Sequence, residues 1–142
     1  MIDWTNPSIQ VTEHFTVKDC LYLHNWGRLA TEADGADFDR LTELCFALEK
    51  VRDILNCPMR VHCIFRSEEY NKSIPGAPTS DPHSRSMACD FDCQPFMSCD
   101  DVKNTLLSHI EELGLRMEDN GAGATWVHID LCPVIHNRFF KP

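Results

Sequence analysis

Between Asp39 and Asn56 the sequence repeats apolar residues at steps of three and four, which is the spacing of one face of an α-helix. The residues of this face are Leu41, Leu44, Leu48, Val51, Ile54 and Leu55. The turn-like sequence NCP follows and ends the pattern. The pattern therefore predicts an amphipathic helix over residues 39–56, whose apolar face must be covered by another layer of structure.

Three shorter segments alternate apolar and polar residues, as half-buried strands do: MRVHCIF at 59–65, MACDFDC at 87–93 and ATWVHIDL at 124–131. Residues 99–114 are typical of a second helix, which begins near Asp100 or Asp101 and ends at Gly114. The N-terminal segment 14–25 predicts a short turn or helix. The order helix, strand, strand, helix, strand predicts an α+β fold, with flanking helices against a small, mostly antiparallel sheet.

A long loop is predicted between the first two strands. Residues 66–86, RSEEYNKSIPGAPTSDPHSRS, contain three prolines, one glycine and five serines, which favour turns over regular structure. Ordered loops of this length in a compact domain usually carry function. We expect this loop to shape the specificity of any site beside it.

The composition bounds the class of protein. A chain of 142 residues is expected to form one domain, residues 1–142. The net charge of −9 disfavours nucleic acid and anionic membranes as partners. The first ten residues, MIDWTNPSIQ, show neither a basic segment nor an apolar one, so no secretory signal is visible and the cytoplasm is the expected location.

Cysteine is frequent, with eight residues in the chain, yet no CxxC pair occurs. This spacing argues against a zinc finger or a thioredoxin-type motif. Several of the cysteines occupy apolar positions of the predicted helices and strands. We therefore expect buried, reduced thiols that act as small hydrophobic side chains.

Strand alternation gathers particular polar side chains. Asp90 and Asp92 share one face of their predicted strand, and His128 and Asp130 share one face of theirs. If these strands are neighbours, Asp90 and His128 converge, and His83 in the preceding loop completes a His/Asp/His set. Three such ligands leave a tetrahedral zinc ion one open position for water, as in catalytic zinc sites. The alternative is a group of strand-edge polar residues that face solvent.

Four segments, in order along the chain, resemble motifs of peptidase family M15, the zinc D-Ala-D-Ala dipeptidases and carboxypeptidases and the phage L-alanyl-D-glutamate endolysins. HFTVKD resembles the family's N-terminal FxxxE entry, and CIFRSEEYN resembles its SGYRS…N segment. HSRSMACD resembles HxxGxAxD, and TWVHID resembles the closing W-x-H strand. The resemblance runs from about His14 to Asp130 and implies the Hedgehog/DD-peptidase fold.

The resemblance also implies roles for single residues. The family's zinc ligands correspond to His83, Asp90 and His128, and the arginine that polarises the substrate carbonyl corresponds to Arg66. Trp126 is expected to form a wall of the substrate site.

These roles have structural alternatives. Ser80 is expected to contribute to substrate binding, near the position of a family serine. Arg66 could instead pair with Glu68 or Asp92, and Trp126 could belong to the core. Asp92 could either orient a metal ligand or occupy a solvated strand position.

The chain lacks the acidic residue that the family motif places before the final histidine. Many family peptidases carry a glutamate or aspartate three residues before the final histidine, as general base, and here that position is Thr125. A threonine does not accept a proton from water at neutral pH. The remaining acids are Asp130, on the same strand face as His128, and Glu118 and Asp119, across the sequence NGAG. Asp130 is the expected catalytic acid, and the alternative is that it orients His128.

Two smaller departures lie next to the first histidine. Ser86 replaces the family glycine, so a positive φ at that residue is mildly strained. Asp81 replaces the serine usually found two residues before His83, and Ser80 lies one residue further away.

The resemblance therefore implies a zinc hydrolase, phage-encoded, that cuts a peptidoglycan peptide or a D-Ala-D-Ala-type dipeptide. Such an enzyme acts in the host cell cytoplasm, as part of a phage particle, or as an endolysin released to the wall. The first alternative is a zinc-binding interaction module of the same fold without turnover, like the Hedgehog signalling domain. The second is a metal-free scaffold with degenerate motifs.

Overall fold

The computed structural model describes residues 1–142 and confirms the predicted α+β class. Its helices are α1 (Val17–Leu21), α2 (Phe38–Leu55), α3 (Glu68–Lys72) and α4 (Cys99–Leu106), with a short 3-10 turn at Glu32–Asp34. Its strands are β1 (Tyr22–Leu23), β2 (Arg28–Leu29), β3 (Arg60–Cys63), β4 (Ala88–Asp92), β5 (Arg116–Glu118), β6 (Val127–Asp130) and β7 (Phe139–Phe140). None of its helices is long and apolar enough to cross a membrane.

Five of the strands form one sheet in the order β3-β4-β6-β5-β7, and β1 pairs with β2 in a small hairpin. All neighbours in the large sheet are antiparallel except β5 and β7, which are parallel. The two strands expected to carry metal ligands, β4 and β6, are hydrogen-bonded neighbours at its centre. The condition for Asp90 and His128 to converge is therefore met.

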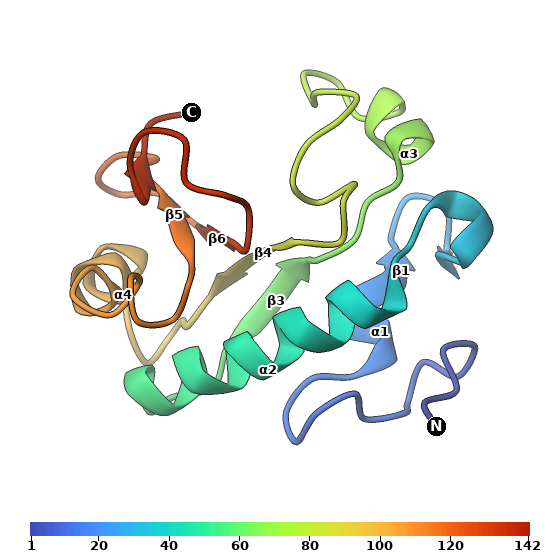
Figure 1. Cartoon of the computed structure of the whole chain (residues 1–142), viewed down its shortest axis with the longest axis horizontal. Coiled ribbons are helices and arrows are strands. Elements are labelled where there is room, and N and C mark those ends of the chain that lie inside the picture. The colour runs from blue at the N-terminus through green and yellow to red at the C-terminus, as the bar shows by residue number, and fades with distance from the viewer.

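Helix α2 supplies one side of the core. Asp37 caps its N-terminus by accepting a hydrogen bond from the backbone N–H of Arg40, and Asn56 ends it in the left-handed conformation. In Figure 1 the helix crosses in front of β3, and one apolar cluster joins its buried residues to those of β4 and β6. The buried residues are Leu41, Leu44, Cys45, Leu48, Val51 and Leu55. This cluster fixes the inner face of the sheet, so the ligands lie on the outer face.

The sequence patterns missed the shortest elements. Helix α3 lies inside the segment predicted as a loop, and β5 and β7 were not predicted. The second helix ends at Leu106 and continues as turns to Gly114, and the last predicted strand begins only at Val127. Elements of two to five residues are too short for a periodic pattern to stand out.

The cysteines are distributed through the interior. All eight are free thiols; six are buried, and Cys57 and Cys63 are partly exposed. The thiol of Cys63 contacts the side chains of two predicted metal ligands, His83 and Asp90.

Candidate metal centre

The ligand residues are positioned by the pairing of β4 with β6. Asp90 lies directly opposite His128 in the register, while Cys89 opposite Ile129 points into the core. His83 comes from the turn before β4, which closes through a hydrogen bond from the N–H of Met87 to the carbonyl of Pro82. The sheet thus supplies two candidate ligands, and the loop supplies the third.

The structure brings the three predicted ligands into contact. His128 Nδ1 lies 2.8 Å from Asp90 Oδ1, and His83 Nε2 lies 3.2 Å from the same oxygen. The two imidazole rings meet edge to face, with their centroids 5.2 Å apart. Both histidines are buried, and Asp90 is partly buried. Two nitrogens therefore converge on one carboxylate oxygen.

Hydrogen bonds on the far side of each ring select the nitrogen that is left for a metal. His83 Nδ1 donates to the carbonyl of Ile64 at 2.8 Å, which leaves Nε2 toward Asp90. His128 Nε2 is held by Asp130 Oδ2 at 2.8 Å, which leaves Nδ1 toward Asp90. A carboxylate or carbonyl behind a ligating imidazole fixes its ring and raises its basicity. The site is therefore preorganised for a cation near Asp90 Oδ1.

Asp130 is itself fully engaged. Its carboxylate accepts two hydrogen bonds from Arg116, at 2.8 and 3.0 Å, and one from the backbone N–H of Cys132. Burial alone raises the pKa of Asp130, but the hydrogen bonds with His128 and Arg116 outweigh it and lower the pKa to about 2. The guanidinium of Arg116 also lies over the ring of Phe140, 4.3 Å from its centroid. These contacts support the alternative in which Asp130 orients His128.

Without a metal, the histidines and carboxylates neutralise one another. Burial lowers the pKa of His83, yet the hydrogen bonds to Asp90 and Cys63 outweigh it and raise that pKa well above the ordinary value. The pKa of His128 is raised in the same way, by Asp130 and Asp90 against the effect of burial. Burial also opposes ionisation of Asp90, but the two histidines hold its pKa far below the ordinary value. Metal binding must therefore displace protons from the rings.

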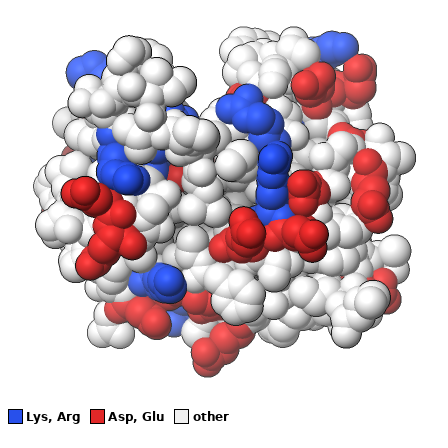
Figure 2. All heavy atoms as spheres, in the orientation of Figure 1, with Lys and Arg blue, Asp and Glu red and all other residues white.

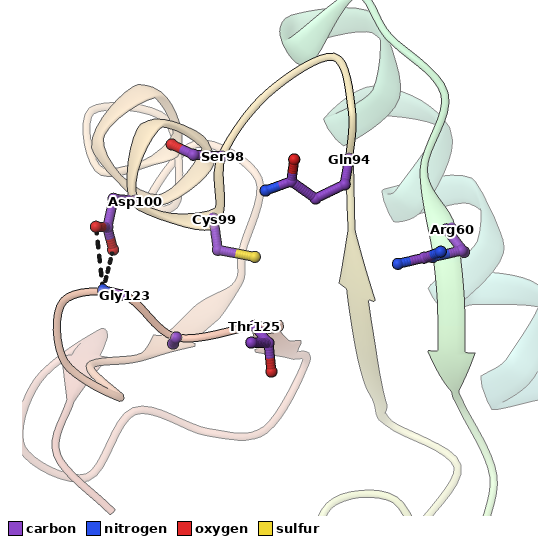
Figure 3. A pocket seen from close by; sticks show the side chains of 8 residues that line it. Arg60, Gln94, Ser98, Cys99, Asp100, Gly123 and Thr125 are labelled. Atoms are coloured by element: carbon purple, nitrogen blue, oxygen red, sulfur yellow. Dashed lines mark hydrogen bonds between the residues drawn. The ribbon is translucent and has the colours of Figure 1, made fainter.

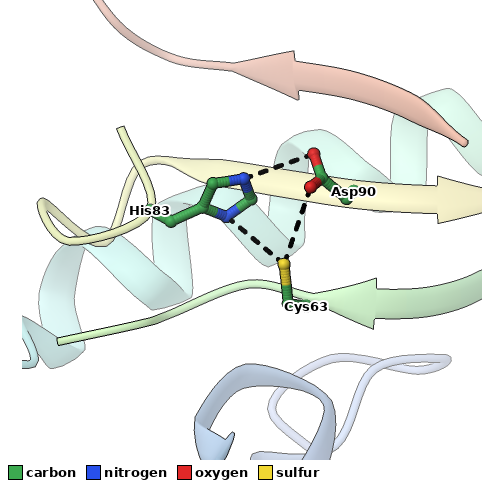
Figure 4. A group of neighbouring side chains, drawn as sticks. All are labelled: Cys63, His83 and Asp90. Carbon is green, nitrogen blue, oxygen red and sulfur yellow. Dashed lines mark hydrogen bonds and ion pairs between the residues drawn. The ribbon is translucent and has the colours of Figure 1, made fainter. Parts of the chain in front are cut away.

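Cys63 is a fourth group at this site, and it was not singled out from the sequence. Figure 4 shows Cys63, His83 and Asp90 as a cluster of the kind that can hold a metal ion. The thiol lies 3.7 Å from Asp90 Oδ2 and 3.7 Å from His83 Nδ1. It therefore faces the carboxylate oxygen and the ring nitrogen that point away from His128.

The donor set suits a divalent transition metal. Two neutral imidazole nitrogens and one carboxylate oxygen are ligands that zinc takes in catalytic sites, where three protein groups leave a position open. The hydrogen-bonded partners behind both rings match what such sites require. His83, Asp90 and His128 would hold the ion.

Arg66 lies beside this set, because its N–H bonds the carbonyl of His83. Its side chain pairs with Asp81 at 3.1 Å rather than with Glu68 or Asp92. The buried Nε of Arg66 has no hydrogen-bond partner in the protein. An unpartnered buried donor is costly, and this atom is shielded from solvent, whereas the side chain as a whole remains partly exposed.

The neighbouring loop residues have separate contacts. Asp81 also accepts from the N–H of Ser84, so both its oxygens are engaged. Ser80 is exposed and forms no hydrogen bond of its own. Ser86 adopts a φ of 60°, the positive value that the family glycine suggested, and its Oγ accepts a hydrogen bond from the N–H of Asp37 at 3.0 Å.

Asp92 is buried and is not a solvated strand residue. It accepts hydrogen bonds from Arg60 and the backbone N–H of Gln94, and His62 Nε2 binds it as well. These partners lie on β3 and just after β4, and none of them is a predicted metal ligand. His62 is accordingly a hydrogen-bonded structural histidine.

Thr125 is exposed and lines a pocket of about 370 Å³ that none of the three ligand residues lines (Figure 3). The loop leading to it is tied to α4, because Lys103 Nζ binds the carbonyl of Gly121 and Asp100 accepts from the N–H of Gly123. Trp126, the next residue, is 39% exposed and so is not part of the core.

Glu118 supplies, beside His128, the kind of acidic side chain that is missing at Thr125. Strand β5 pairs Arg116 with Asp130 and Met117 with Ile129 of β6, and the same register continued by one residue places Glu118 opposite His128. Met117 is in the core, so alternation puts Glu118 on the same outer face as Arg116. The Glu118 side chain is half-buried and forms no hydrogen bond or ion pair, whereas the carboxylates of Asp119 and Asp130 are both engaged. Of the three acids considered, it is the one with a free carboxylate.

The outer face is open to solvent beside these strands. Figure 2, in the orientation of Figure 1, shows a hollow between two projecting parts of the surface, with basic side chains on both sides. One part contains β5 and the C-terminal segment, and the other contains α3 and the loop that follows it. Strands β4 and β6 lie between the two parts.

Comparison with known proteins gives one match. A family model described as Peptidase M15 matches residues 14–130, from before α1 to the last residue of β6. No curated protein and no solved structure matches the chain significantly. The matched range includes every ligand residue described above.

Proposed function

The chain belongs to peptidase family M15, and we propose that it is a zinc-dependent peptidase that hydrolyses a peptide bond of bacterial peptidoglycan or a D-Ala-D-Ala-type dipeptide. The observation that carries the proposal is the convergence of His83 Nε2 and His128 Nδ1 on Asp90 Oδ1, with both outer nitrogens already bonded. Zinc in this set would polarise the scissile carbonyl and lower the pKa of a water molecule.

Arg66 is the proposed electrophilic residue of the chain. Its side chain is anchored by Asp81 through Nη2, and its partly exposed guanidinium can donate a hydrogen bond to the carbonyl oxygen of the substrate. A fixed donor aimed at the oxygen where negative charge develops lowers the barrier to acyl transfer. Asp81 binds Nη2 and so keeps the guanidinium in place without occupying its other N–H groups.

Glu118 is the proposed proton carrier. A water molecule gives one proton to the Glu118 carboxylate while the oxygen of that water bonds to the carbonyl carbon of the substrate. The C–N bond then breaks, and the leaving nitrogen takes the proton from Glu118. Asp130, expected from the sequence in this role, has its oxygens engaged by Arg116, His128 and Cys132. Its contacts support an orienting role instead.

The finer assignments rest on the family motifs alone. The proposal includes a phage-encoded endolysin whose substrate is a wall peptide, with Trp126 and Ser80 at the rim of the substrate site. Both side chains are exposed, which is compatible with substrate contact. Its place of action is then the infected cell or the wall reached from it.

The test combines metal analysis with a digest of muropeptides by protein purified without chelator. We expect about one zinc per chain, loss of zinc in His83→Ala and His128→Ala, and release of new peptide termini by the wild type. Glu118→Gln is expected to keep its zinc and to lose about 100-fold or more in turnover. The matched control is Glu112→Gln, an exposed carboxylate distant in sequence from every ligand.

A second candidate function is a zinc-binding module without turnover. It is favoured by Thr125 at the position of the family acid, in a pocket that the ligand residues do not line. Stoichiometric zinc without cleavage of any muropeptide supports the module. Cleavage that depends on Glu118 supports the enzyme, and cleavage that survives in His83→Ala contradicts the proposed ligand set.

A further inference from the structure

We infer that the Cys63 thiol positions Asp90 for metal binding, by donating a hydrogen bond to Oδ2 so that Oδ1 alone faces the histidines. This inference rests on the proposed metal site and deepens it. The thiol lies 3.7 Å from Oδ2, within the range of a bond to sulfur, while Oδ1 is the oxygen approached by His83 and His128. The two carboxylate oxygens therefore have separate partners.

A β-bulge brings Cys63 to this position. Strand β3 pairs Arg60 with Asp92 and Val61 with Phe91, and the register then shifts so that Cys63 pairs with Asp90. An unshifted register would have placed His62 opposite Asp90. Bulges near functional sites re-aim side chains in this way. The extra residue, His62, is the one that reaches Asp92 instead.

The same geometry argues against Cys63 as a ligand. On its side of the cluster the thiol meets His83 Nδ1, and that nitrogen already donates to the carbonyl of Ile64 at 2.8 Å. A metal ion between Cys63 and His83 would have to break this bond. An ion near Asp90 Oδ1 uses nitrogens whose outer partners, the carbonyl of Ile64 and Asp130, remain in place. Cys63 thus acts through Asp90.

A hydrogen bond to the outer oxygen of a ligating carboxylate holds its orientation, and loss of such partners lowers metal affinity by about 10- to 100-fold. A thiol is a weak donor, so the lower end of that range applies. Serine, which the family motif carries at this position, retains a donor. Alanine retains none.

The experiment measures zinc affinity by competition with a chromogenic chelator in four proteins: wild type, Cys63→Ala, Cys63→Ser and the control Cys57→Ala. Cys57 is the other partly exposed thiol. We expect about 10-fold weaker binding in Cys63→Ala, with Cys63→Ser and Cys57→Ala within about 3-fold of wild type. Melting curves in chelator check that each metal-free variant is folded.

Cobalt(II) loading separates positioning from ligation. Thiolate ligation gives an intense charge-transfer absorption in the near ultraviolet, and we expect the wild type to lack it. That absorption, if present and lost in Cys63→Ser, would make Cys63 a ligand and overturn the inference. Equal zinc affinity in wild type and Cys63→Ala also overturns it, with the proposed function intact. A wild type that binds no zinc contradicts the proposed function and this inference together.

Discussion

His128 Nε2 lies 2.8 Å from Asp130 Oδ2, and Asp130 in turn accepts both N–H groups that Arg116 directs at it. The chain His128–Asp130–Arg116 runs across two adjacent strands and is buried at its centre. The imidazole therefore cannot turn without breaking an ion pair behind it. This relationship favours a positioning role for Asp130 and Arg116 over a direct part in the reaction.

Asp130→Asn is expected to weaken zinc binding by about 10- to 100-fold, because the ring of His128 loses the carboxylate that orients it. It also leaves the guanidinium of Arg116 without its counter-charge, at a cost of about 3 kcal/mol in the free energy of unfolding. Chelator competition and urea denaturation measure the two effects. Asp119→Asn, which removes an exposed pair with Lys141, is the control. Unchanged zinc affinity in Asp130→Asn would falsify the orienting role.

Removal of the metal is expected to lower the melting temperature. Zinc binds the folded site and stabilises it by about 2.7 kcal/mol when present at 100 times its dissociation constant. For a chain of 142 residues this corresponds to a decrease of about 10 °C in chelator. His83→Ala, which lacks a ligand, should show no such difference between zinc and chelator. A wild-type melting curve that is the same with zinc and with chelator contradicts a tightly held ion.

Arg66→Lys is expected to reduce kcat about 100-fold and to leave the zinc content unchanged. Lysine keeps the charge opposite Asp81 but loses the planar fork that aims a second donor at the substrate. Steady-state kinetics on a muropeptide, normalised to bound zinc, measure the effect. Arg40→Lys, on the exposed side of α2, is the control. Full activity in Arg66→Lys would assign the carbonyl to another donor.

Ser86 combines a left-handed backbone with a hydrogen bond from the N–H of Asp37, the N-cap of α2, and two substitutions separate these contributions. Ser86→Ala loses the bond and keeps the strain, so it should destabilise the fold by about 1–2 kcal/mol. Ser86→Gly loses the same bond but removes strain of about 1 kcal/mol, so it should destabilise less. Urea denaturation in chelator gives both values. The reverse order would show that the strain at φ 60° is negligible.

Asp34 provides a pH-dependent contribution away from the metal site. Its hydrogen bonds with Arg28, together with those from Thr31, outweigh burial and lower the pKa of Asp34 to about 2. Since this folded-state pKa lies below the ordinary 3.8, the carboxylate stabilises the fold at higher pH and loses that effect as pH falls toward 2. Arg28 is half-exposed, so the contribution is about 1 kcal/mol. Unfolding of wild type and Asp34→Asn should differ by this amount at pH 7 and converge near pH 2.

The sequence predicted those parts of the fold that repeat over many residues. The apolar steps of 39–56 correspond to α2 at Phe38–Leu55, and alternation put Asp90 and His128 on the outer faces of β4 and β6. The pairing of those two strands was only a condition, because alternation fixes a face and not a neighbour. The identity of the ligand set stays a prediction until a metal is measured.

Other features depend on single-residue details that periodicity does not record. Cys63 meets Asp90 only through the bulge in β3, which inserts one residue into an otherwise regular strand. Arg116 and Glu118 lie on a strand of three residues, which is too short for alternation to be recognised. Asp81 pairs with Arg66 because the long loop folds back, and loop paths follow from tertiary contacts rather than local pattern.

The pairing of Asp90 with His128 across a chain separation of 38 residues also sets when a metal can be captured during folding. The intervening segment contains α4 and β5, and its ends meet where β4 pairs with β6. With the proposed ligand set, a newly made chain would have no complete metal site until its central strands pair. Metal uptake would then report that these distant segments have paired, and a chain that stalls earlier would be left without its ion.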